Sequence, residues 1–352
     1  MQTVDLIIDR QDRILVTGAG GFIGRAVVQR LLEAGFTNLR CLVRSNPSER
    51  LQEIVAEHPD ARVEVFQGNL LSRDDCRSAC QGVVLVYHLA AGRGEKSFPD
   101  AYLNSAVTTR NLLEAVALNR NIRRFVNISS FAVYTNRNKG KRRTLDESCP
   151  IETRADLRGE AYCFAKLKQD EIVVEYCGKL DIPYVIVRPG AVYGEGNEKI
   201  SGRIGIDTFG VFLHMGGLNS IPLTYVDNCA EAIMLAGIVS GVDGEVFNVV
   251  DDNLPSSREF LRLYKRNVKR FHSIYVPHLF SYALCAAWEK YSKWSDGQLP
   301  PAFNRRRWHA FWKSTRYSND KLKQRLNWKP LVSTSDGLSR YFRSCRVEHK
   351  NA

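Results

Sequence analysis

Two residues four positions apart carry the most specific chemical signal in the sequence. Tyr162 and Lys166 stand at i and i+4 in the stretch Tyr-Cys-Phe-Ala-Lys, and on a helix such residues share a face. A tyrosine hydroxyl titrates at about 10 and is a weak base at neutral pH, but a nearby ammonium favours its phenolate. The pair therefore predicts acid–base chemistry. Ser129 and Ser130, at the end of a predicted strand, strengthen this interpretation.

A glycine-rich turn accompanies the pair. The predicted strand Ile14-Leu15-Val16 runs into Thr17-Gly18-Ala19-Gly20-Gly21-Phe22-Ile23-Gly24, and a helix is predicted to follow. Glycines at 18, 21 and 24 allow a tight turn, a close approach to a pyrophosphate, and packing of the helix on the strand. The helix N-terminus then offers unpaired N–H groups to the anion. The turn predicts a dinucleotide site.

The residue that ends the second predicted strand bears on the choice of cofactor. An acidic residue here would bind the adenosine ribose, whereas Arg44 suits a 2′-phosphate, and Arg50 is placed to assist it. The sequence therefore favours NADP(H), with NAD(H) left open. The alternative is that Arg44 is an ordinary solvated arginine.

Short apolar runs alternate with helix-length segments, which is typical of an α/β fold with a doubly wound parallel sheet. Strands are predicted at 14–16, 39–43, 62–66, 83–88, 124–129, 184–188 and 246–249, and helices at 22–33, 102–118, 159–177 and 230–238. Residues 191–225 look irregular, and the chain from Pro255 onward looks mostly helical. We expect a dinucleotide-binding domain of residues 1–188, completed by 226–250. Residues 189–225 and 251–352 would form a smaller substrate-binding region.

Taken together, these motifs resemble those of the extended short-chain dehydrogenase/reductases, and the resemblance runs over nearly the whole chain. Asn69 stands where the family usually has aspartate, and Asn327 where it has glycine. The matching segments are Thr17 to Gly24, His88 to Ala91, Asn104 with Thr108, Ser130 with Tyr134, Tyr162 with Lys166, Arg188 to Gly190, Tyr193-Gly194, Tyr225 to Asn228 and Leu326 to Pro330.

The resemblance implies roles for individual residues. Tyr162 would exchange a proton with the substrate, Ser130 would hydrogen-bond the same oxygen, and Lys166 would hold the nicotinamide ribose and favour the tyrosinate. C4 of the nicotinamide would exchange hydride. The implied cofactor site comprises Gly18, Gly21, Phe22, Ile23, Gly24, Arg44, Asn69, Leu70, Leu89, Ala90, Ala91, Asn104, Tyr162, Lys166, Pro189 and Val192.

The substrate is less constrained by the sequence. Gly190 stands where nucleotide-sugar enzymes of this family often have an amide, and Phe131-Ala132 where dehydratases have an Asp-Glu pair. The apolar stretch 276–288 and the aromatics of 280–317 resemble the 3β-hydroxysteroid dehydrogenase branch. We therefore expect a bulky, apolar alcohol or ketone. A nucleotide-sugar epimerase or reductase is the alternative, with Arg203, Arg258 and Arg305 to Arg307 as cations for its diphosphate.

Composition limits the remaining classes. The net charge of +12 suits anionic partners, but no nucleic-acid-binding module accompanies the basic runs at 137–143 and 305–307. The nine scattered cysteines show no zinc spacing and read as free thiols of a cytoplasmic protein without a bound metal. The stretch 276–288 is too short to span a bilayer, but it is compatible with peripheral membrane contact.

Two further alternatives concern assembly and activity. The helices at 102–118 and 159–177 are candidates for a homodimer interface. A redox-sensing or scaffolding protein without catalysis is also conceivable for this fold, but such proteins usually lack the tyrosine or the lysine, and both are present here.

Overall fold

The computed structural model describes residues 5–92, 97–137, 144–198, 200–208, 210–295, 298 and 303–351. Its centre is a seven-stranded parallel sheet in the order β12-β7-β5-β4-β1-β2-β3. The order reverses direction between β1 and β4, and ligands of such sheets bind at that point, beyond the carboxyl ends of the strands. The strands are β1 (Ile14–Thr17), β2 (Asn38–Val43), β3 (Arg62–Gln67), β4 (Leu85–His88), β5 (Arg124–Ile128), β7 (Tyr184–Pro189) and β12 (Val246–Val249).

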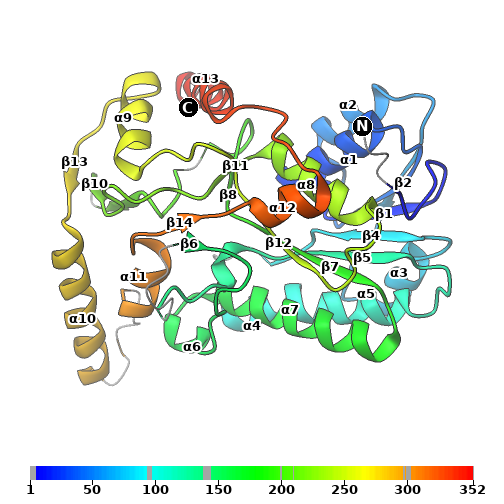
Figure 1. Cartoon of the computed structure of the whole chain (residues 1–352), viewed down its shortest axis with the longest axis horizontal. Helices are drawn as coiled ribbons and strands as arrows, with labels where there is room; N and C mark the ends of the chain where they lie inside the picture. Colours follow the sequence, from blue (N-terminus) through cyan, green and yellow to red (C-terminus); the bar gives the residue numbers. More distant parts are fainter. Residues whose placement is uncertain are drawn as a thin grey trace.

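Helices cover both faces of this sheet, which explains why its inner strands are apolar on both sides (Figure 1). One face packs on α1 (Phe22–Glu33), α8 (Val226–Ile238) and α12 (Asp320–Leu326). The other packs on α3 (Arg73–Ala79), α5 (Thr108–Val116) and α7 (Ala161–Leu180). The doubly wound α/β fold predicted from the sequence is confirmed.

A second group of elements lies beyond the carboxyl edge of the sheet and at one end of the molecule (Figure 1). It contains three small sheets. The first pairs β8 (Ala191–Tyr193) with β11 (Leu223–Tyr225), and the second pairs β6 (Thr144–Leu145) with β14 (Arg316–Tyr317). In the third, β10 (Val211–His214) lies between β9 (Gly205–Thr208) and β13 (Ser273–Tyr275).

The remaining helices of the whole molecule are α2 (Glu49–Ala56), α4 (Phe98–Tyr102), α6 (Ala155–Arg158), α9 (Ser257–Asn267), α10 (His278–Trp294), α11 (Arg305–Phe311) and α13 (Thr334–Asn351).

Two sequence predictions need correction here. Residues 191–225 are not irregular, since they contain β8 to β11; these strands are three or four residues long, too short to show an alternating pattern. The predicted helix 102–118 is instead α4, the π-helical turn η1 (Leu103–Val107) and α5 in succession. The division into a cofactor domain and a substrate region remains a prediction.

Smaller shifts concern the ends of elements. The strand predicted from Val83 starts at Leu85, and the helix predicted from Gly159 starts at Ala161. Gly159 has a φ of 68° and ends the short helix α6. This left-handed conformation favours glycine, so Gly159 separates two helices.

Candidate active site

An open pocket lies at the carboxyl edge of the sheet, around the glycine-rich turn. It has a volume of about 610 Å³ and contains eight of the residues predicted to bind the cofactor: Gly18, Gly21, Arg44, Asn69, Leu70, Ala90, Ala91 and Asn104. Its wall also includes Ser45, Asn46, Ser48, Gly92 and Thr108, which were not predicted. The first three follow Arg44 in one loop, a position that could have suggested them.

The geometry of the turn accounts for its glycines. Gly18 has a φ of +68°, and a Cβ there would lie 3.0 Å from the Ala90 backbone nitrogen. A Cβ on Gly24 would lie 2.1 Å from the Gly18 carbonyl oxygen. Helix α1 therefore packs directly on the turn, and its N-terminus opens into the pocket beside Gly21.

Eight predicted cofactor residues do not line this pocket: Gly24 in the turn, Tyr162 and Lys166 on α7, and five others. Ile23, Leu89 and Val192 pack against the core between the sheet and helices α1 and α8. Phe22 begins α1 with the Arg25 guanidinium 5.8 Å from its ring centre. Pro189 is buried at the end of β7. Their contact with a cofactor remains a prediction.

The predicted catalytic residues come from two elements that meet at the same edge of the sheet. Ser130 is the second residue after β5, and its hydroxyl accepts a hydrogen bond from the Ala132 amide at 3.1 Å. Tyr162 lies half-buried in the first turn of α7. Burial raises the pKa of Tyr162, and a hydrogen bond with Ser130 opposes that rise. The tyrosine and serine hydroxyls are therefore neighbours.

Lys166 lies one turn further along α7 and is almost fully buried. Its ammonium donates hydrogen bonds to the Ile128 carbonyl oxygen at 2.6 Å and to Gln169 Oε1 at 2.8 Å. Burial lowers the pKa of Lys166 to about 8, and the charge of Asp170 opposes that change. The sequence predicted that Lys166 would lower the pKa of Tyr162, but the effect of burial is larger and the pKa is raised.

A buried ion-pair network beneath these residues was not predicted. The Asp170 carboxylate accepts hydrogen bonds from Asn127 at 2.9 Å, from Ser129 at 2.8 Å and from Arg188 at 3.1 Å. Arg188 also donates to the Tyr134 hydroxyl at 3.2 Å. The spacing of Asp170, four residues after Lys166 on the same helix, was the available signal. The network ties α7 to β5 and β7, which carry the site.

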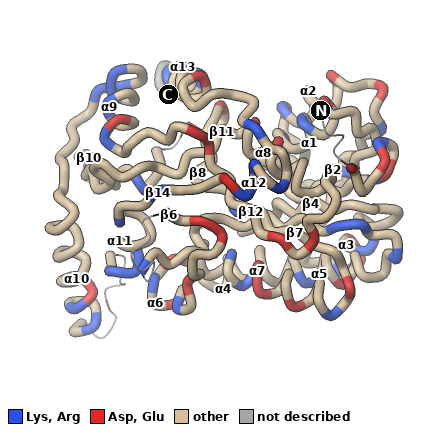
Figure 2. The backbone as a smooth tube through the Cα atoms, in the orientation of Figure 1, with Lys and Arg blue, Asp and Glu red and all other residues tan. Residues whose placement is uncertain are grey.

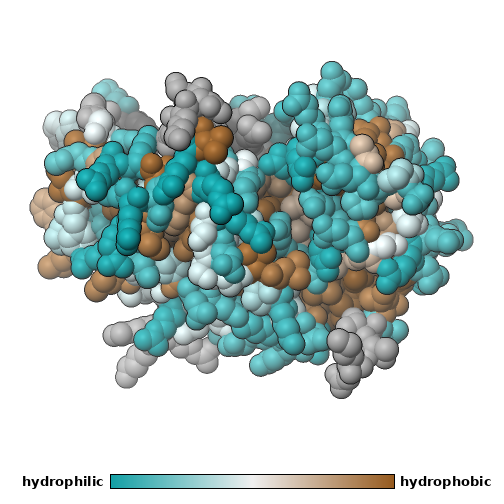
Figure 3. Space-filling model, turned by 90° about the horizontal axis from the view of Figure 1, so that it is seen from above, coloured by the Kyte–Doolittle hydropathy of each residue, from teal (hydrophilic) through white to brown (hydrophobic). Residues whose placement is uncertain are grey.

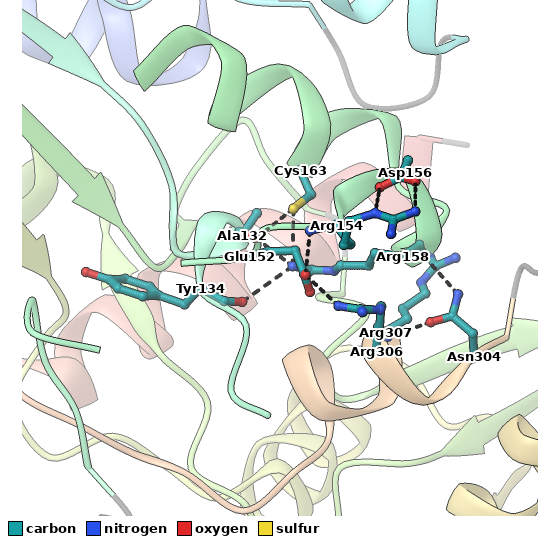
Figure 4. A network of polar contacts seen from close by, with 10 residues as sticks. All are labelled: Ala132, Tyr134, Glu152, Arg154, Asp156, Arg158, Cys163, Asn304, Arg306 and Arg307. Carbon is teal, nitrogen blue, oxygen red and sulfur yellow. Dashed lines mark hydrogen bonds and ion pairs between the residues drawn. The ribbon is translucent and has the colours of Figure 1, made fainter. Parts of the chain in front are cut away.

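A second network fixes the start of α7 (Figure 4). Arg158, which is fully buried, donates to the Ala132 carbonyl oxygen at 2.6 Å, and the Cys163 thiol points at the same oxygen from 3.1 Å. Asn304 donates to the Arg158 carbonyl oxygen at 2.9 Å, and Arg306 pairs with Glu152 at 2.7 Å. The segment after Ser130, the start of α7 and helix α11 are thereby joined.

Aromatic and cationic side chains lie next to Ser130. The ring of Phe131 stacks on Tyr317 at 5.6 Å, and the Arg203 guanidinium moderates the pKa of Tyr317, which burial raises. Arg203 and Arg307 lie 5.3 and 5.7 Å from the ring centre of Phe311. The Arg158 guanidinium lies 5.6 Å from the same ring centre, so three cations from different segments approach one aromatic ring on this side of the site.

The other arginines considered from the sequence are placed elsewhere. Arg305 pairs with Glu289 at 3.0 Å, and Arg258 lies 5.3 Å from the ring centre of Tyr275. Arg50 pairs with Glu53 at 2.9 Å and is not part of the cofactor pocket wall. Of the basic run at 137–143, Arg137 is described, and residues 138–143 lie outside the described part of the chain.

The apolar stretch 276–288 falls mostly on α10, which borders a second pocket of about 410 Å³. That pocket is lined by Ile206, Leu213, Met215, Val276, Ser281, Leu284, Cys285, Ala287, Trp288, Tyr291 and Phe303. Ser130, Tyr162 and Lys166 do not line it. Helix α11 packs between α10 and α6 (Figure 1), so the apolar pocket is separated from the first turn of α7.

Membrane-spanning helices, metal sites and disulfides were also considered from the sequence. Among the described residues, no helix has the length and apolar character needed to cross a bilayer. Within the same part of the chain, no three His, Cys, Asp or Glu side chains are grouped to hold a metal ion. All nine cysteines are free thiols, as predicted, and eight of them are buried.

Comparison with known proteins agrees with this geometry. Cinnamoyl-CoA reductase 1 from Oryza sativa subsp. japonica is 30% identical over 51% of this chain and 53% of its own length. A 3β-hydroxysteroid dehydrogenase/isomerase from Mycobacterium tuberculosis is 29% identical over 53% of this chain and 48% of its own. The chain thus spans about half the length of these relatives. GDP-mannose 3,5-epimerase 1 from Oryza sativa subsp. japonica is 26% identical over 71% of this chain and 67% of its own.

Solved structures share the fold over almost the whole chain. UDP-glucuronic acid 4-epimerase from Bacillus cereus, in complex with NAD and a fluorinated UDP-sugar, superposes with a TM-score of 0.70. It is 22% identical, over 96% of this chain and 99% of its own. The model of the NAD dependent epimerase/dehydratase family matches residues 14–249. This chain therefore belongs to the NAD dependent epimerase/dehydratase family, within the extended short-chain dehydrogenase/reductases.

Proposed function

We propose that this protein interconverts a secondary alcohol and a ketone with a nicotinamide nucleotide, using Tyr162, Ser130 and Lys166. The observation that carries the proposal is the meeting of Tyr162 and Ser130 at the sheet edge that also holds the dinucleotide pocket. The nucleotide, when bound, supplies hydride exchange at its nicotinamide. The protein's part is to orient the reactants and to move a proton at the substrate oxygen.

Each residue has a separate task in this proposal. Tyr162 exchanges the proton, while Ser130, already beside it, hydrogen-bonds the same substrate oxygen. Lys166 is held deep in α7 by the Ile128 carbonyl and Gln169, which leaves one N–H of its ammonium for the ribose. Gly18, Gly21 and the N-terminus of α1 would bind the pyrophosphate.

For the substrate, we infer a molecule that carries an anionic group near the reacting carbon, as nucleotide sugars do. Arg203 and Arg307 beside Phe311 supply cations on the Ser130 side of the site, and guanidinium groups bind phosphates well. The glycine at 190 is explained by packing, since a Cβ there would lie 2.1 Å from the Pro222 carbonyl oxygen. It therefore gives no support to an apolar substrate.

The second candidate is the bulky, apolar alcohol or ketone favoured by the sequence. The specific observation for it is the apolar pocket of about 410 Å³ beside α10, a volume suited to a small ligand. Its separation from Tyr162 counts against it, because the reacting carbon must reach the catalytic hydroxyl.

One assay separates the two candidates. The purified protein is incubated with NAD(H) or NADP(H) and with UDP- and GDP-sugars, and separately with 3-hydroxy and 3-keto sterols. Cofactor absorbance and product identity are followed. Conversion of an anionic substrate, lost in Arg203→Ala, is the expected result. Turnover of sterols alone would overturn the substrate assignment, and no turnover of any alcohol or ketone would overturn the proposed activity.

We propose that NADP(H) is the preferred cofactor, with NAD(H) as the alternative. Arg44, Ser45, Asn46 and Ser48 form one side of the adenosine end of the pocket. Arg44 is exposed and pairs with no acidic residue in the described part of the chain, so its guanidinium is available to a 2′-phosphate.

We also propose that α10 rests on an anionic lipid surface. Its outward face exposes Leu279 at 84% and Trp294 at 77%, together with Phe280, Leu284 and Tyr291. The single acidic residue of the helix, Glu289, is neutralised by Arg305. Lys290 and Lys293 flank the face, and Figure 2 shows α10 free of charged residues except at its lower end. Figure 3 shows some apolar residues at the left margin of the molecule, the end at which Figure 1 places α9, β13 and α10.

Sedimentation with vesicles tests this contact. Binding to phosphatidylglycerol vesicles, weakened in Phe280→Ser/Trp294→Ser and unchanged in Leu118→Ser, is expected, because Leu118 is similarly exposed but lies elsewhere, after α5. Equal binding of all three proteins, or a dimer in lipid-free solution that the double variant dissociates, would assign the face to something other than lipid.

A further inference from the structure

A continuous chain of buried hydrogen bonds runs from the catalytic lysine to the glycine-rich turn. Lys166 donates to Gln169 Oε1 at 2.8 Å, and Gln169 Nε2 donates to Thr109 Oγ1 at 2.9 Å. The His88 Nε2 atom lies 2.8 Å from the same Thr109 oxygen, and His88 Nδ1 lies 2.8 Å from Thr17 Oγ1. All five side chains are buried, so no solvent competes for these bonds.

The donor in each of these bonds can be assigned from the partners. The Thr109 hydroxyl gives its proton to the Ser105 carbonyl oxygen at 2.6 Å. It must therefore accept from both Gln169 and His88, which places the His88 proton on Nε2. His88 Nδ1 then accepts from Thr17. Burial lowers the pKa of His88 to about 3, so the ring stays neutral and the pattern is compatible with neutral pH.

This pattern fixes the orientation of the Gln169 amide. Its N–H group is committed to Thr109, so its oxygen must face Lys166. The other charged or titratable groups facing the ammonium are Asp170 on α7, itself paired with Arg188 on β7, and the neutral His88 on β4. Gln169 is thus a neutral acceptor, and it is tied through Thr109 to elements that border the cofactor pocket.

We propose that Gln169 is a positioning residue for Lys166, holding the ammonium so that its remaining N–H points to the ribose of a bound nicotinamide nucleotide. Thr109 and His88 act through Gln169 by keeping its amide in one orientation. The inference rests on the proposed function only in naming the ribose as the third partner. The link between Gln169 and the protonation of Lys166 does not depend on it.

Two variants of Gln169 test the proposal: one adds a negative charge beside Lys166, and the other removes the side-chain oxygen that accepts its hydrogen bond. In Gln169→Glu, a carboxylate beside the ammonium should raise the pKa of Lys166 by about one to three units. In Gln169→Leu, loss of the acceptor should lower it. Lys168→Gln is the matched control, because Lys168 lies on the same helix, is partly exposed, and pairs with Glu171 outside the chain of bonds.

Two measurements test the proposal. The first is the carbon-13 NMR titration of Lys166 Cε without cofactor, with the resonance assigned by its absence in Lys166→Met. We expect a midpoint of about 8 for the wild type, a higher midpoint for Gln169→Glu, and no change from the wild type for Lys168→Gln. The second is calorimetric binding of NADH and NADPH at neutral pH, where Gln169→Leu should weaken the better nucleotide about tenfold at least, as expected for a hydrogen bond to a charged group.

The outcomes separate the possible failures. If Gln169 had only a structural role, Gln169→Leu would have a lower melting temperature, but the titration midpoint of Lys166 in Gln169→Glu would equal that of the wild type. That result would overturn the proposal. Nucleotide affinity within twofold of wild type in a folded Gln169→Leu would also overturn it. If neither nucleotide binds the wild type, the proposed function and the ribose contact fall, while the NMR titration still decides whether Gln169 controls the ammonium.

Discussion

At the scale of single residues, the free-energy cost of burying the Lys166 ammonium should make the unfolding free energy depend on pH. Folding lowers its pKa from 10.5 to about 8, so between these values the unfolded chain binds more protons, and raising the pH stabilises the wild type. Lys166→Met has no ammonium to bury. Relative to this variant, wild-type unfolding free energy should therefore rise by about 2 kcal/mol between pH 7 and pH 10. Urea denaturation at several pH values measures the difference; a constant difference would contradict the assigned cost of burial.

The prediction that NADP(H) is preferred depends on Arg44. If its guanidinium pairs with the 2′-phosphate, Arg44→Asp should weaken NADPH binding about tenfold to a hundredfold, since a charge-assisted hydrogen bond contributes about 1.5–3 kcal/mol. NADH binding should change little. Calorimetry with both nucleotides measures this, and Arg50→Asp serves as a control because Arg50 lies outside the pocket wall. A wild type that prefers NADH would show that Arg44 has another role.

At the scale of elements, we expect the contact between α1 and the glycine-rich turn to tolerate no larger side chain. A Cβ on Gly24 would lie 2.1 Å from the Gly18 carbonyl oxygen, so Gly24→Ala must push the helix away from the turn. We expect destabilisation by about 1–3 kcal/mol, as for overpacking, together with weaker nucleotide binding.

Gly178→Ala is the matched control for Gly24→Ala. Gly178 lies within α7, and a Cβ there would meet nothing within 4 Å. Gly178→Ala should therefore stabilise the protein by about 0.5–1 kcal/mol through helix propensity. Thermal denaturation and nucleotide binding of both variants measure the contrast. If Gly24→Ala matched Gly178→Ala in stability and affinity, the proposed close packing would be wrong.

The elements also show what could be predicted from the sequence. The parallel sheet followed from apolar runs separated by helix-length segments. The turn at Gly18 to Gly24 was predicted to bind a dinucleotide, and the structure has an open pocket around it. Strands β8 to β11 were missed, because runs of three or four residues carry no period. The Asp170 and Gln169 networks were missed because their partners are distant in sequence, for example Thr109 and Arg188. The α10 stretch was correctly seen as apolar, but its separation from Tyr162 depends on how α11 packs.

At the scale of the whole molecule, self-association is the open structural prediction. Tyr102 and Leu103, at the junction of α4 and η1, and Val174 on α7 are exposed on the helical layer below the sheet in Figure 1. We expect a homodimer through this layer, which buries these apolar side chains. Leu103→Arg should shift sedimentation toward the monomer, while Leu218→Arg, at an exposed leucine elsewhere, should not. A wild type that stays monomeric at high concentration would rule this interface out.

The central claim, that Tyr162 transfers the proton in a nicotinamide-dependent reaction, is tested most directly by the turnover number of Tyr162→Phe. The measurement uses the substrate that the wild type converts fastest, with folding and nucleotide affinity checked first. The account predicts a variant with wild-type melting temperature and nucleotide affinity and a kcat lower by about 10²–10⁴, the usual contribution of a general acid or base. A kcat within twofold of wild type in a folded, nucleotide-binding variant would contradict it.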